Sequence, residues 1–449
     1  MQWHRIESLE ITIEKLVYGG DGLGRLPGDE QGRGKAVFVP FTLTGEKVQA
    51  SIEQDKRGFA RAKIENISAA SVHRIEPACP YFQGCGGCHY QHTDYENQLA
   101  IKSEILSENL RRLAKLKLPS EIRVHPSPPW NYRNRTRLQV RGEGDFALGY
   151  FKASSHALLP VETCPISSPL LNRAIQVLWQ MGRAGKVPPA LREIELFANE
   201  DDSQLQIELY SDRRVADQRN GLRSTQAFAE LLRTEVPELV SVYSFAQTIA
   251  MARGGEGHIS EEPDWMLHPG EFRYRTQSGA LRVSGGSFFQ VNRFLVDKLV
   301  SIVTAGRSGT MALDLYAGVG LFSVALASSF DHIMAVESSQ SSVSDLQYNS
   351  QPKVKAVRAK VDEFLTRRGV NLHPDLVVAD PPRAGLGDRV ARALVQLAAP
   401  RLMYVSCDPA TLARDLVPLI GGGYQVEQAH LIDLFPQTYH IETVVELVR

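Results

Sequence analysis

RLMYVSCDPATLARD, residues 401–415, combines an apolar run, a turn and the start of a helix. Residues 402–405 predict a buried strand, residues 406–409 predict a turn, and Thr411 opens a helix. Cys407 therefore lies where a buried strand meets a turn, a position at which a thiol is both held and reached. The alternative is an ordinary core cysteine, because free Cys is among the most buried residue types.

Two further segments end an apolar run in the same way. Residues 375–379 are followed by DPPR, residues 380–383, and residues 434–442 read LFPQTYHIE. In an open α/β sheet such segments meet at the carboxyl edge, so we expect Asp380, Cys407 and Glu442 to share one crevice. The alternatives are a rigid turn at the first segment and a surface position for the second.

The composition is that of a globular protein. The chain has 449 residues, 43% hydrophobic and 22% charged, and predicts two to four domains. Its formal net charge of −1 gives no overall basic field, so a nucleic acid would have to be bound by local clusters. The first residues hold no apolar signal core, and no run of about 18 apolar residues occurs. We expect a cytoplasmic protein with no membrane partner.

Residues 1–68 contain short alternating runs separated by glycine-rich turns, as in GGDGLGR at residues 19–25. Alternation of period two with dense turn signals predicts a small antiparallel barrel. Barrels of this kind often bind single-stranded nucleic acid, although a purely structural barrel has the same composition.

Five cysteines are present, and four of them form a spacing pattern. Three lie in CPYFQGCGGCHYQH as Cys79, Cys85 and Cys88, and Cys164 follows far downstream. An odd number of cysteines in a large protein argues for ligands and one reactive thiol rather than for disulfides. Four thiolates suit either zinc or an iron–sulfur cluster, with His89 and His92 as additional zinc ligands.

The region 69–280 predicts a mixed α/β domain. Apolar residues at helical spacing predict an amphipathic helix over 95–118, which is a candidate to pack on the C-terminal domain. Four arginines then alternate along one predicted strand: Arg133, Arg135, Arg137 and Arg141. A row of guanidinium groups has few structural uses and fits phosphates and base edges, so this face is a candidate RNA contact.

Residues 281–449 predict strands alternating with helices. A strand over 311–315 enters the turn YAGVG, and a second strand over 332–336 ends in Glu337, which is placed to accept both hydroxyls of a ribose. Ser323 occupies the third glycine position of a dinucleotide fingerprint. This departure favours S-adenosylmethionine, which has a ribose but no phosphate, over a dinucleotide. An ordinary strand-to-helix turn is the alternative.

Together, YVSCDPATLARD, DPPRAG, FPQTYHIETV, SFFQVN and DLYAGVG resemble the motifs of the TrmA/RumA-type RNA uracil-5 methyltransferases, over nearly the whole chain. GGDGLGR, FVPFTLTGE and FARAKI are similar to the TRAM domain, an RNA-binding barrel of OB type. CPYFQGCGGCHYQH with a distant Cys-Pro is similar to the 4Fe-4S motif of the same enzymes. The combination of barrel and cluster resembles most the RumA/RlmD-like enzymes that act on 23S ribosomal RNA.

This resemblance implies a role for each candidate residue. Cys407 is implied as the nucleophile that adds to carbon 6 of uracil, and Glu442 as the base that removes the carbon-5 proton. The implied S-adenosylmethionine contacts are Gln290, Tyr316, Glu337 and Asp380. The implied cluster ligands are Cys79, Cys85, Cys88 and Cys164. Asp408 stands where the family usually has Asn, and its charge would oppose a thiolate; Leu321 replaces a polar residue.

We therefore expect an α/β multidomain protein in three parts: an N-terminal OB/TRAM β-barrel (1–68), a central α/β domain with an iron–sulfur cluster (69–280) and a C-terminal Rossmann-like SAM-dependent methyltransferase domain (281–449). The expected partner is RNA, most of all 23S ribosomal RNA, and not DNA, and the expected state is a monomer. The alternatives are a tRNA uracil-5 methyltransferase, an amino-group methyltransferase sharing the Asp-Pro-Pro motif, and a non-catalytic RNA-binding iron–sulfur protein. Arg383 counts against the amino-group enzyme, which needs an aromatic ring there.

Overall fold

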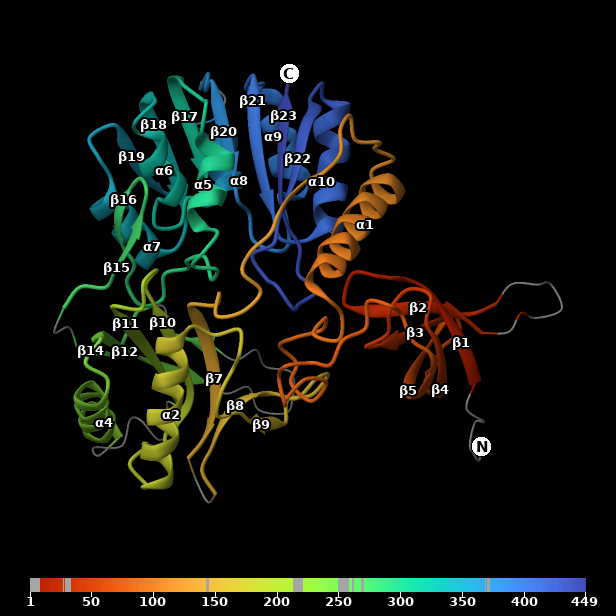
Figure 1. Ribbon diagram of the computed structural model, residues 1–449. Coiled ribbons are helices and arrows are strands. Elements are labelled where there is room, and N and C mark those ends of the chain that lie inside the picture. Colours follow the sequence, from red (N-terminus) through yellow and green to blue (C-terminus); the bar gives the residue numbers. More distant parts are fainter. Residues whose placement is uncertain are drawn as a thin grey trace.

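The computed structural model describes the chain except residues 1–8, 27, 29–33, 143–144, 213–220, 249–257, 261, 268–269, 368 and 370–371. Figure 1 shows an upper part made of the C-terminal strands and helices, a lower part made of the central strands, and a small barrel beside them. The helix α1 lies between the barrel and the upper part. Residues 1–8 of the expected barrel lie outside the described residues.

The N-terminal part is a small closed barrel, as predicted, although one of its strand pairs is parallel where the sequence predicted antiparallel pairing. Its strands are β1 (Leu9–Leu16), β2 (Asp21–Arg25), β3 (Ala36–Pro40), β4 (Lys47–Asp55) and β5 (Phe59–Ala69), in the order β1-β2-β3-β5-β4. Alternate residues fill the interior, among them Ile11, Ile13, Val37 and Val48. The period of two in the sequence therefore separates interior from exterior side chains.

The central part is a mixed sheet with helices on one face. Its strands are β7 (Arg135–Arg141), β8 (Ala147–Phe151), β9 (Leu158–Pro160), β10 (Leu191–Ala198), β11 (Leu205–Asp212), β12 (Leu239–Thr248), β13 (His258–Ile259) and β14 (Trp265–Leu267). They follow the order β13-β12-β11-β10-β7-β8-β9, with β14 beside β12. The helices α2 (Pro169–Arg183) and α4 (Gly221–Glu235) bury apolar side chains against it, and the ribbon β15 (Arg273–Thr276) and β16 (Gly279–Arg282) leads to the next part.

The C-terminal part is an α/β sheet in the order β19-β18-β17-β20-β21-β23-β22-β6. Its strands are β17 (Gly309–Leu315), β18 (Phe330–Glu337), β19 (Val354–Arg358), β20 (Leu376–Ala379), β21 (Arg401–Ser406), β22 (Gln425–Ile432), β23 (Glu442–Val448) and β6 (Arg123–His125). Its helices are α5 (Val296–Thr304), α6 (Leu321–Leu326), α7 (Gln340–Asn349), α8 (Val361–Arg367), α9 (Gly387–Leu397) and α10 (Pro409–Gly421).

Strands β17 to β21 of this sheet are parallel, and β23 runs antiparallel to both β21 and β22. The parallel set carries its loops at one edge, where ligands bind in sheets of this kind. The last strand, β6, comes from the segment just after α1 and pairs in parallel with β22. The segment 123–125 thus belongs to the C-terminal sheet although the chain reaches it before the central domain.

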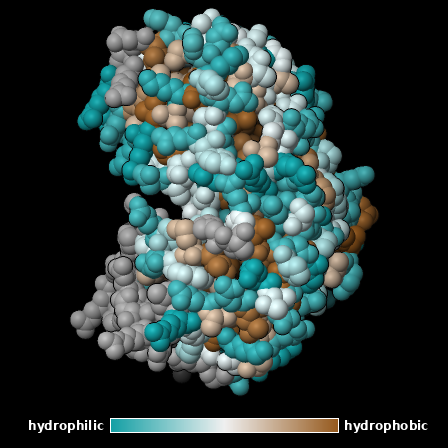
Figure 2. Space-filling model, turned by 90° about the vertical axis from the view of Figure 1, so that its left-hand side faces the viewer, coloured by the Kyte–Doolittle hydropathy of each residue, from teal (hydrophilic) through white to brown (hydrophobic). Residues whose placement is uncertain are grey.

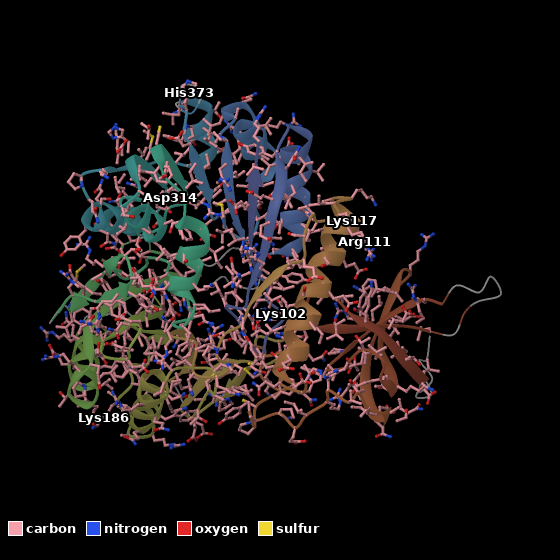
Figure 3. All side chains as sticks on the ribbon, turned by 45° about the horizontal axis from the view of Figure 1, so that its top comes forward. Lys102, Arg111, Lys117, Lys186, Asp314 and His373 are labelled. Atoms are coloured by element: carbon pink, nitrogen blue, oxygen red, sulfur yellow. The ribbon has the colours of Figure 1, made fainter. Side chains whose placement is uncertain are left out.

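Helix α1 (Tyr95–Leu113) packs on the C-terminal sheet beside α10. Its buried residues Ile105 and Leu106 belong to the same apolar core as Leu412 of α10. The helix ends five residues before the predicted end, because Lys115 adopts a left-handed conformation with φ 55°. Figure 3 shows Lys102 in the interior of the molecule, whereas Arg111 and Lys117 lie at the outer end of the helix.

The surface is mostly hydrophilic on the face seen in Figure 2, which is hollowed between the upper and lower parts of the molecule. Within the described ranges, no helix combines the length and the apolar character needed to cross a membrane.

Candidate active site and cysteine site

The predicted strand–turn–helix around Cys407 is present. Strand β21 ends at Ser406, and α10 begins at Pro409. The Asp408 side chain caps the helix by accepting hydrogen bonds from the amides of Ala410 (3.0 Å) and Thr411 (2.9 Å). This cap satisfies amides that have no partner inside the helix. The capped turn holds Cys407, which is partly exposed, at the edge of the sheet where β21 ends.

The three motif segments meet at this edge, as the sequence predicted. Strand β20 ends one residue before Asp380, β21 ends one residue before Cys407, and β23 begins at Glu442. Strand β21 pairs with β20 on one side and with β23 on the other. Because these strands are neighbours, their ends place Asp380, Cys407 and Glu442 within electrostatic reach of one another.

Burial and like charges raise the proton affinity of all three groups. Burial, and then the charge of Glu442, raise the pKa of the Cys407 thiol to about 12, while Arg383 opposes the rise. Burial raises the pKa of Asp380 to about 7, and burial together with Asp380 raises the pKa of Glu442 well above its usual value. In the free protein the thiol is therefore protonated at neutral pH, and its activation requires added positive charge.

Residues 433–441, which precede Glu442, form a loop that several segments hold. The buried Lys102 ammonium of α1 pairs with Asp433 (2.6 Å) and donates to the carbonyl of Phe435 (2.9 Å). Gln98, one turn earlier, exchanges two hydrogen bonds with Gln437. The amides of His89 and Tyr90 both donate to the Gln437 carbonyl, at 2.8 and 3.0 Å. The loop is fixed by α1 and by the cysteine segment together.

His440, to which the sequence assigned no role, contacts Arg383 in this loop. The Arg383 guanidinium lies 2.6 Å from His440 Nδ1, which must accept the hydrogen bond. Burial, and then Arg383, lower the pKa of His440 to about 3, so the imidazole is neutral. This contact orients the one arginine that opposes the raised pKa of Cys407. Nothing in the spacing of the two motifs indicated the pair.

The predicted cofactor turn follows β17. Tyr316, Gly318 and Gly320 all adopt positive φ, of 61°, 53° and 96°, and bring the backbone toward the edge of the sheet. Glu337, at the end of β18, accepts a hydrogen bond from the Gly318 amide (3.0 Å) and one from the Ser339 amide (2.7 Å). Tyr316 and Glu337 line a cavity of about 360 Å³ together with residues that the sequence did not single out: Ser338, Lys360, Val361, Asp362 and Leu386 to Val390.

Asp314 is a further acid that sequence reasoning missed, although it lies in the quoted DLYAGVG motif. It is fully buried in β17 and accepts a hydrogen bond from Ser323 Oγ (Figure 3). Burial raises its pKa to about 7, and the charges of Asp380 and Glu337 contribute to the rise. The presence of an acid within an otherwise apolar predicted strand could have identified Asp314 as a candidate site residue. Three acids thus surround the cofactor turn.

Gln290 lies in the segment 284–292, which links the central and C-terminal parts. It is 8% exposed, and the neighbouring Asn292 donates to Ser127 Oγ (2.9 Å) and to the Leu434 carbonyl (3.1 Å). Phe288, two residues earlier, is 65% exposed, whereas Phe289 is buried. This segment therefore joins the loop 433–441 to the central sheet and presents an aromatic ring at the surface.

The arginine row lies on one face of the segment that ends in β7, as the alternation predicted, but two of its four charges are paired with glutamates. Arg135 forms ion pairs with Glu195 and Glu208, and Arg137 pairs with Glu193 and Glu195 (2.6 Å to Glu195 Oε2). The expectation that such a row has few structural uses was wrong, because the glutamates come from β10 and β11, far along the chain. The sequence of one strand does not reveal them.

The four cysteines of the predicted cluster line one cavity of about 310 Å³: Cys79, Cys85, Cys88 and Cys164. All four are free thiols. The charge of Cys164 acts on each of the other three, and burial raises the pKa of Cys85 to about 11 and that of Cys88 to about 12. Within the part of the chain that the structure describes, no three potential ligands have the geometry for a single metal ion.

The positive charge of Arg133 lies beside these thiols, as would suit a negatively charged iron–sulfur cluster. The Arg133 guanidinium lines the same cavity, its charge acts on Cys85 and Cys88, and its Nε atom is buried without a hydrogen-bond partner. A buried polar atom of this kind needs a partner. Four thiolates around an iron–sulfur cluster would carry net negative charge that this arginine offsets. The donor set therefore fits a 4Fe-4S cluster, which is larger than a single ion.

Comparison with protein families gives two matches. Residues 94–449 match the family described as tRNA (Uracil-5-)-methyltransferase, and residues 2–64 match the TRAM domain. The first match covers most of the chain and contains the Cys407, Asp380 and Glu442 motifs. The second coincides with the five-stranded barrel.

Among similar proteins, an uncharacterized RNA methyltransferase of Aquifex aeolicus is 32% identical, with 98% of each chain covered. The 23S rRNA (uracil(1939)-C(5))-methyltransferase RlmD of Halomonas elongata is also 32% identical, with 98% of this chain and 89% of that protein covered. In the solved structure of Pyrococcus abyssi tRNA (uracil-54, C5)-methyltransferase with S-adenosyl-L-homocysteine, 23% of residues are identical, with a TM-score of 0.71 over 98% of this chain and all of the other. This likeness shows a shared fold.

Proposed function

Because this chain belongs to the family of S-adenosylmethionine-dependent RNA (uracil-5-)-methyltransferases, we propose that it forms 5-methyluridine in 23S ribosomal RNA. The observation that carries the chemistry is the convergence of Cys407, Asp380 and Glu442 at the ends of three adjacent strands. The 32% identical ribosomal RNA enzyme, similar over nearly its whole length, supports the substrate. A transfer RNA substrate is the second candidate, since the matched family and the P. abyssi enzyme carry that description.

The reaction that we propose begins at Cys407. Its thiolate adds to carbon 6 of the flipped-out uracil, and the electron pair of the 5,6 double bond moves toward the carbonyl at carbon 4. Carbon 5 would then attack the methyl group of S-adenosylmethionine, the bond from that methyl group to the positively charged sulfur would break, and S-adenosylhomocysteine would leave with the electron pair. Glu442 takes the proton from carbon 5, the carbon–sulfur bond to Cys407 breaks, and the double bond re-forms.

The electrostatics of the site suit this sequence. The raised pKa of Cys407 keeps the thiol protonated in the free protein, and Arg383 is the cation that favours its ionisation. A positively charged ligand near Asp380 and Glu442 would lower the proton affinity of all three groups. The raised pKa of Glu442 makes its carboxylate a stronger base than an exposed one. Ionisation is thereby linked to the arrival of the cofactor.

We propose that Gln290, Tyr316, Glu337 and Asp380 hold the cofactor. Glu337 lies at the end of the second strand with its carboxylate in the cavity, where it suits the ribose hydroxyls. The backbone turn at Tyr316 leaves its amides close to the same space. Asp362, which lines this cavity, is an additional candidate contact.

We further propose that the four cysteines bind a 4Fe-4S cluster with a positioning role. The cysteine segment continues directly into His89 and Tyr90, whose amides hold the Gln437 carbonyl. A bound cluster would fix this segment and with it the loop that leads to Glu442. Iron and sulfide analysis of the purified protein, with its visible absorption spectrum, tests this assignment; stoichiometric zinc without sulfide would refute it.

Covalent trapping on RNA containing 5-fluorouridine tests the function. Fluorine at carbon 5 cannot leave as a proton, so an enzyme with this mechanism stalls as a protein–RNA adduct. We expect a denaturation-resistant adduct with a 23S fragment and S-adenosylmethionine, and none for Cys407→Ala. If an adduct forms only with transfer RNA, then transfer RNA and not 23S ribosomal RNA is the substrate. Cofactor binding without any adduct would refute the mechanism and favour a non-catalytic RNA-binding protein.

A further inference from the structure

A side chain of the barrel reaches the catalytic turn. Tyr18 lies between β1 and β2, and its hydroxyl donates a hydrogen bond to the backbone carbonyl of Cys407 at 3.2 Å. The two residues are 389 positions apart in the sequence. Tyr18 is partly buried, and the charges that act on its hydroxyl come from Asp408, Arg383, Tyr439 and Cys407. The phenol therefore lies among the groups proposed for catalysis.

The turn that carries Tyr18 is held in place. Gly19 and Gly20 have φ of 112° and 95°, and the Gly20 amide donates to the Val17 carbonyl (3.1 Å). A Cβ atom on Gly20 would lie 3.1 Å from the Cβ atom of His89, so the turn packs closely on the cysteine segment. A side chain at this position would be strained by both its conformation and this contact. The turn is thus shaped to fit its neighbours.

Buried apolar side chains and one ion pair also hold the barrel against the C-terminal part. Leu16 at the end of β1 and Leu43 after β3 are 4% and 1% exposed, and both belong to the core that includes Tyr404 of β21. Lys15 also forms an ion pair with Glu108 of α1. The barrel is therefore anchored against the C-terminal part on both sides of the Tyr18 turn. This anchoring holds the Tyr18 hydroxyl in position to donate to the Cys407 carbonyl.

Ring contacts continue from Tyr18 along the loop 433–441. The Tyr18 ring meets the Tyr439 ring edge to face, with centroids 5.4 Å apart and planes at 87°. Tyr439 in turn contacts His89 at 4.5 Å and His440 at 4.3 Å. Edge-to-face pairs of this kind are favourable beyond their apolar area. One tyrosine of the barrel thus contacts both the nucleophile turn and the loop that leads to the base.

We propose that Tyr18 is a positioning residue for methyl transfer, so that the barrel is part of the active site and not only an RNA-binding module. Within the turn, Ser406 Oγ donates to the Asp408 carbonyl, and Asp408 caps α10. The bond from Tyr18 acts on the Cys407 peptide itself. Fixing this peptide orients the thiol for attack on carbon 6, since small displacements of a reacting group cost large factors in rate.

Single-turnover trapping by the full-length protein tests this inference, which rests on the proposed function. Tyr18→Phe removes the hydroxyl and keeps the ring against Tyr439. At saturating 5-fluorouridine RNA and S-adenosylmethionine we expect adduct formation to slow by about fivefold to tenfold. We expect the RNA dissociation constant and the melting temperature to stay within about twofold and about 2 °C of wild type. Tyr348→Phe, which removes an exposed hydroxyl on α7, is the matched control.

Each result is decisive. A slower saturated rate with unchanged RNA affinity supports a positioning role, and Tyr18→Ala should slow the reaction further by removing the ring contact. A wild-type rate for Tyr18→Phe overturns the inference while leaving the proposed function intact, and so does a change confined to RNA affinity. If the wild-type protein forms no adduct with any RNA, both the proposed function and this inference are refuted.

Discussion

The buried Glu195 of the central sheet and the buried acids beside Cys407 have pKa values shifted in opposite directions. At the catalytic edge, burial raises the pKa of Asp380 to about 7 and that of Glu442 well above its usual value. In the central sheet, burial also acts on Glu195, but Arg135 and Arg137 outweigh it and lower the pKa of that carboxyl. At Glu195 two guanidinium groups outweigh burial, whereas at the neighbouring Glu208, which pairs with Arg135, burial still raises the pKa. The direction of the shift therefore depends on how much positive charge each buried acid receives.

The contributions of Glu195 and of the acids beside Cys407 to stability should therefore respond to pH in opposite directions. An acid with a raised pKa in the folded state retains its proton while the unfolded chain loses one, so its cost to stability grows as pH rises from about 4 to about 7. The stabilisation by Glu195 is present above the ordinary Glu pKa near 4.5 and is lost as pH falls through the lowered pKa of the folded state.

The largest expected effect is at Glu442, the proposed base. Glu442→Gln should reduce turnover by about 10²–10⁴-fold, because the carbon-5 proton then has no acceptor. We expect the methylated adduct with ordinary RNA to accumulate, visible as a shifted band on a denaturing gel. In the wild type, turnover should rise with pH through a pKa above the usual Glu value, since the carboxylate is the active form.

The matched control is Glu427→Gln, which neutralises an exposed carboxylate on β22 that pairs only at the surface with Arg401. It should leave turnover unchanged. A Glu442→Gln variant that releases methylated RNA at the wild-type rate would show that another group takes the proton.

The second largest expected effect is on stability, at the buried ion pair of Lys102 and Asp433. Lys102 and Asp433 are both fully buried, and Lys102→Met leaves the acid without its cation. We expect the free energy of unfolding to fall by about 3–5 kcal/mol in urea denaturation. The double variant Lys102→Met/Asp433→Asn should recover part of this loss. Arg392→Met, which breaks an exposed pair on α9, should cost less than about 1 kcal/mol.

A paired and an unpaired acid can then be compared directly. Glu195→Gln should lower the free energy of unfolding at pH 7.5 by about 2 kcal/mol, because two guanidinium groups lose their shared carboxylate. Asp380→Asn should raise it by about 1 kcal/mol at the same pH, and this gain should shrink as pH falls and disappear below about pH 4, where Asp380 is protonated in the folded and the unfolded state alike. Destabilisation by Asp380→Asn at pH 7.5 would contradict the comparison.

The smallest effect concerns the acid next to the nucleophile. The charge of Asp408 raises the pKa of Cys407, while its side chain caps α10. Asp408→Asn keeps a cap of similar strength and removes the charge. We expect alkylation of Cys407 by iodoacetamide at pH 8, followed by peptide mass spectrometry, to become about twofold to threefold faster. Asp388→Asn on α9 should not change this rate.

The sequence predicted those parts of the fold that depend on local pattern. Alternation indicated the barrel, and strand–turn–helix signals placed Cys407 and Tyr316 at the edge of a parallel sheet. The end of α1 was misplaced, because the left-handed conformation of Lys115 has no signature such as glycine. The structural use of the arginine row was not foreseen, because the glutamate partners of Arg135 and Arg137 lie on other strands, while RNA contact by this row stays a prediction.

By itself, the sequence determined the order of the motifs, and the resemblance of these motifs to a known family implied the candidate nucleophile, base and cluster ligands, since such motifs are defined by residue type along the chain. Only the tertiary structure decided which charges are compensated and that Tyr18 of the barrel contacts Cys407. The physical reason is that desolvation and long-range contacts depend on elements hundreds of residues apart, which meet only when the chain folds.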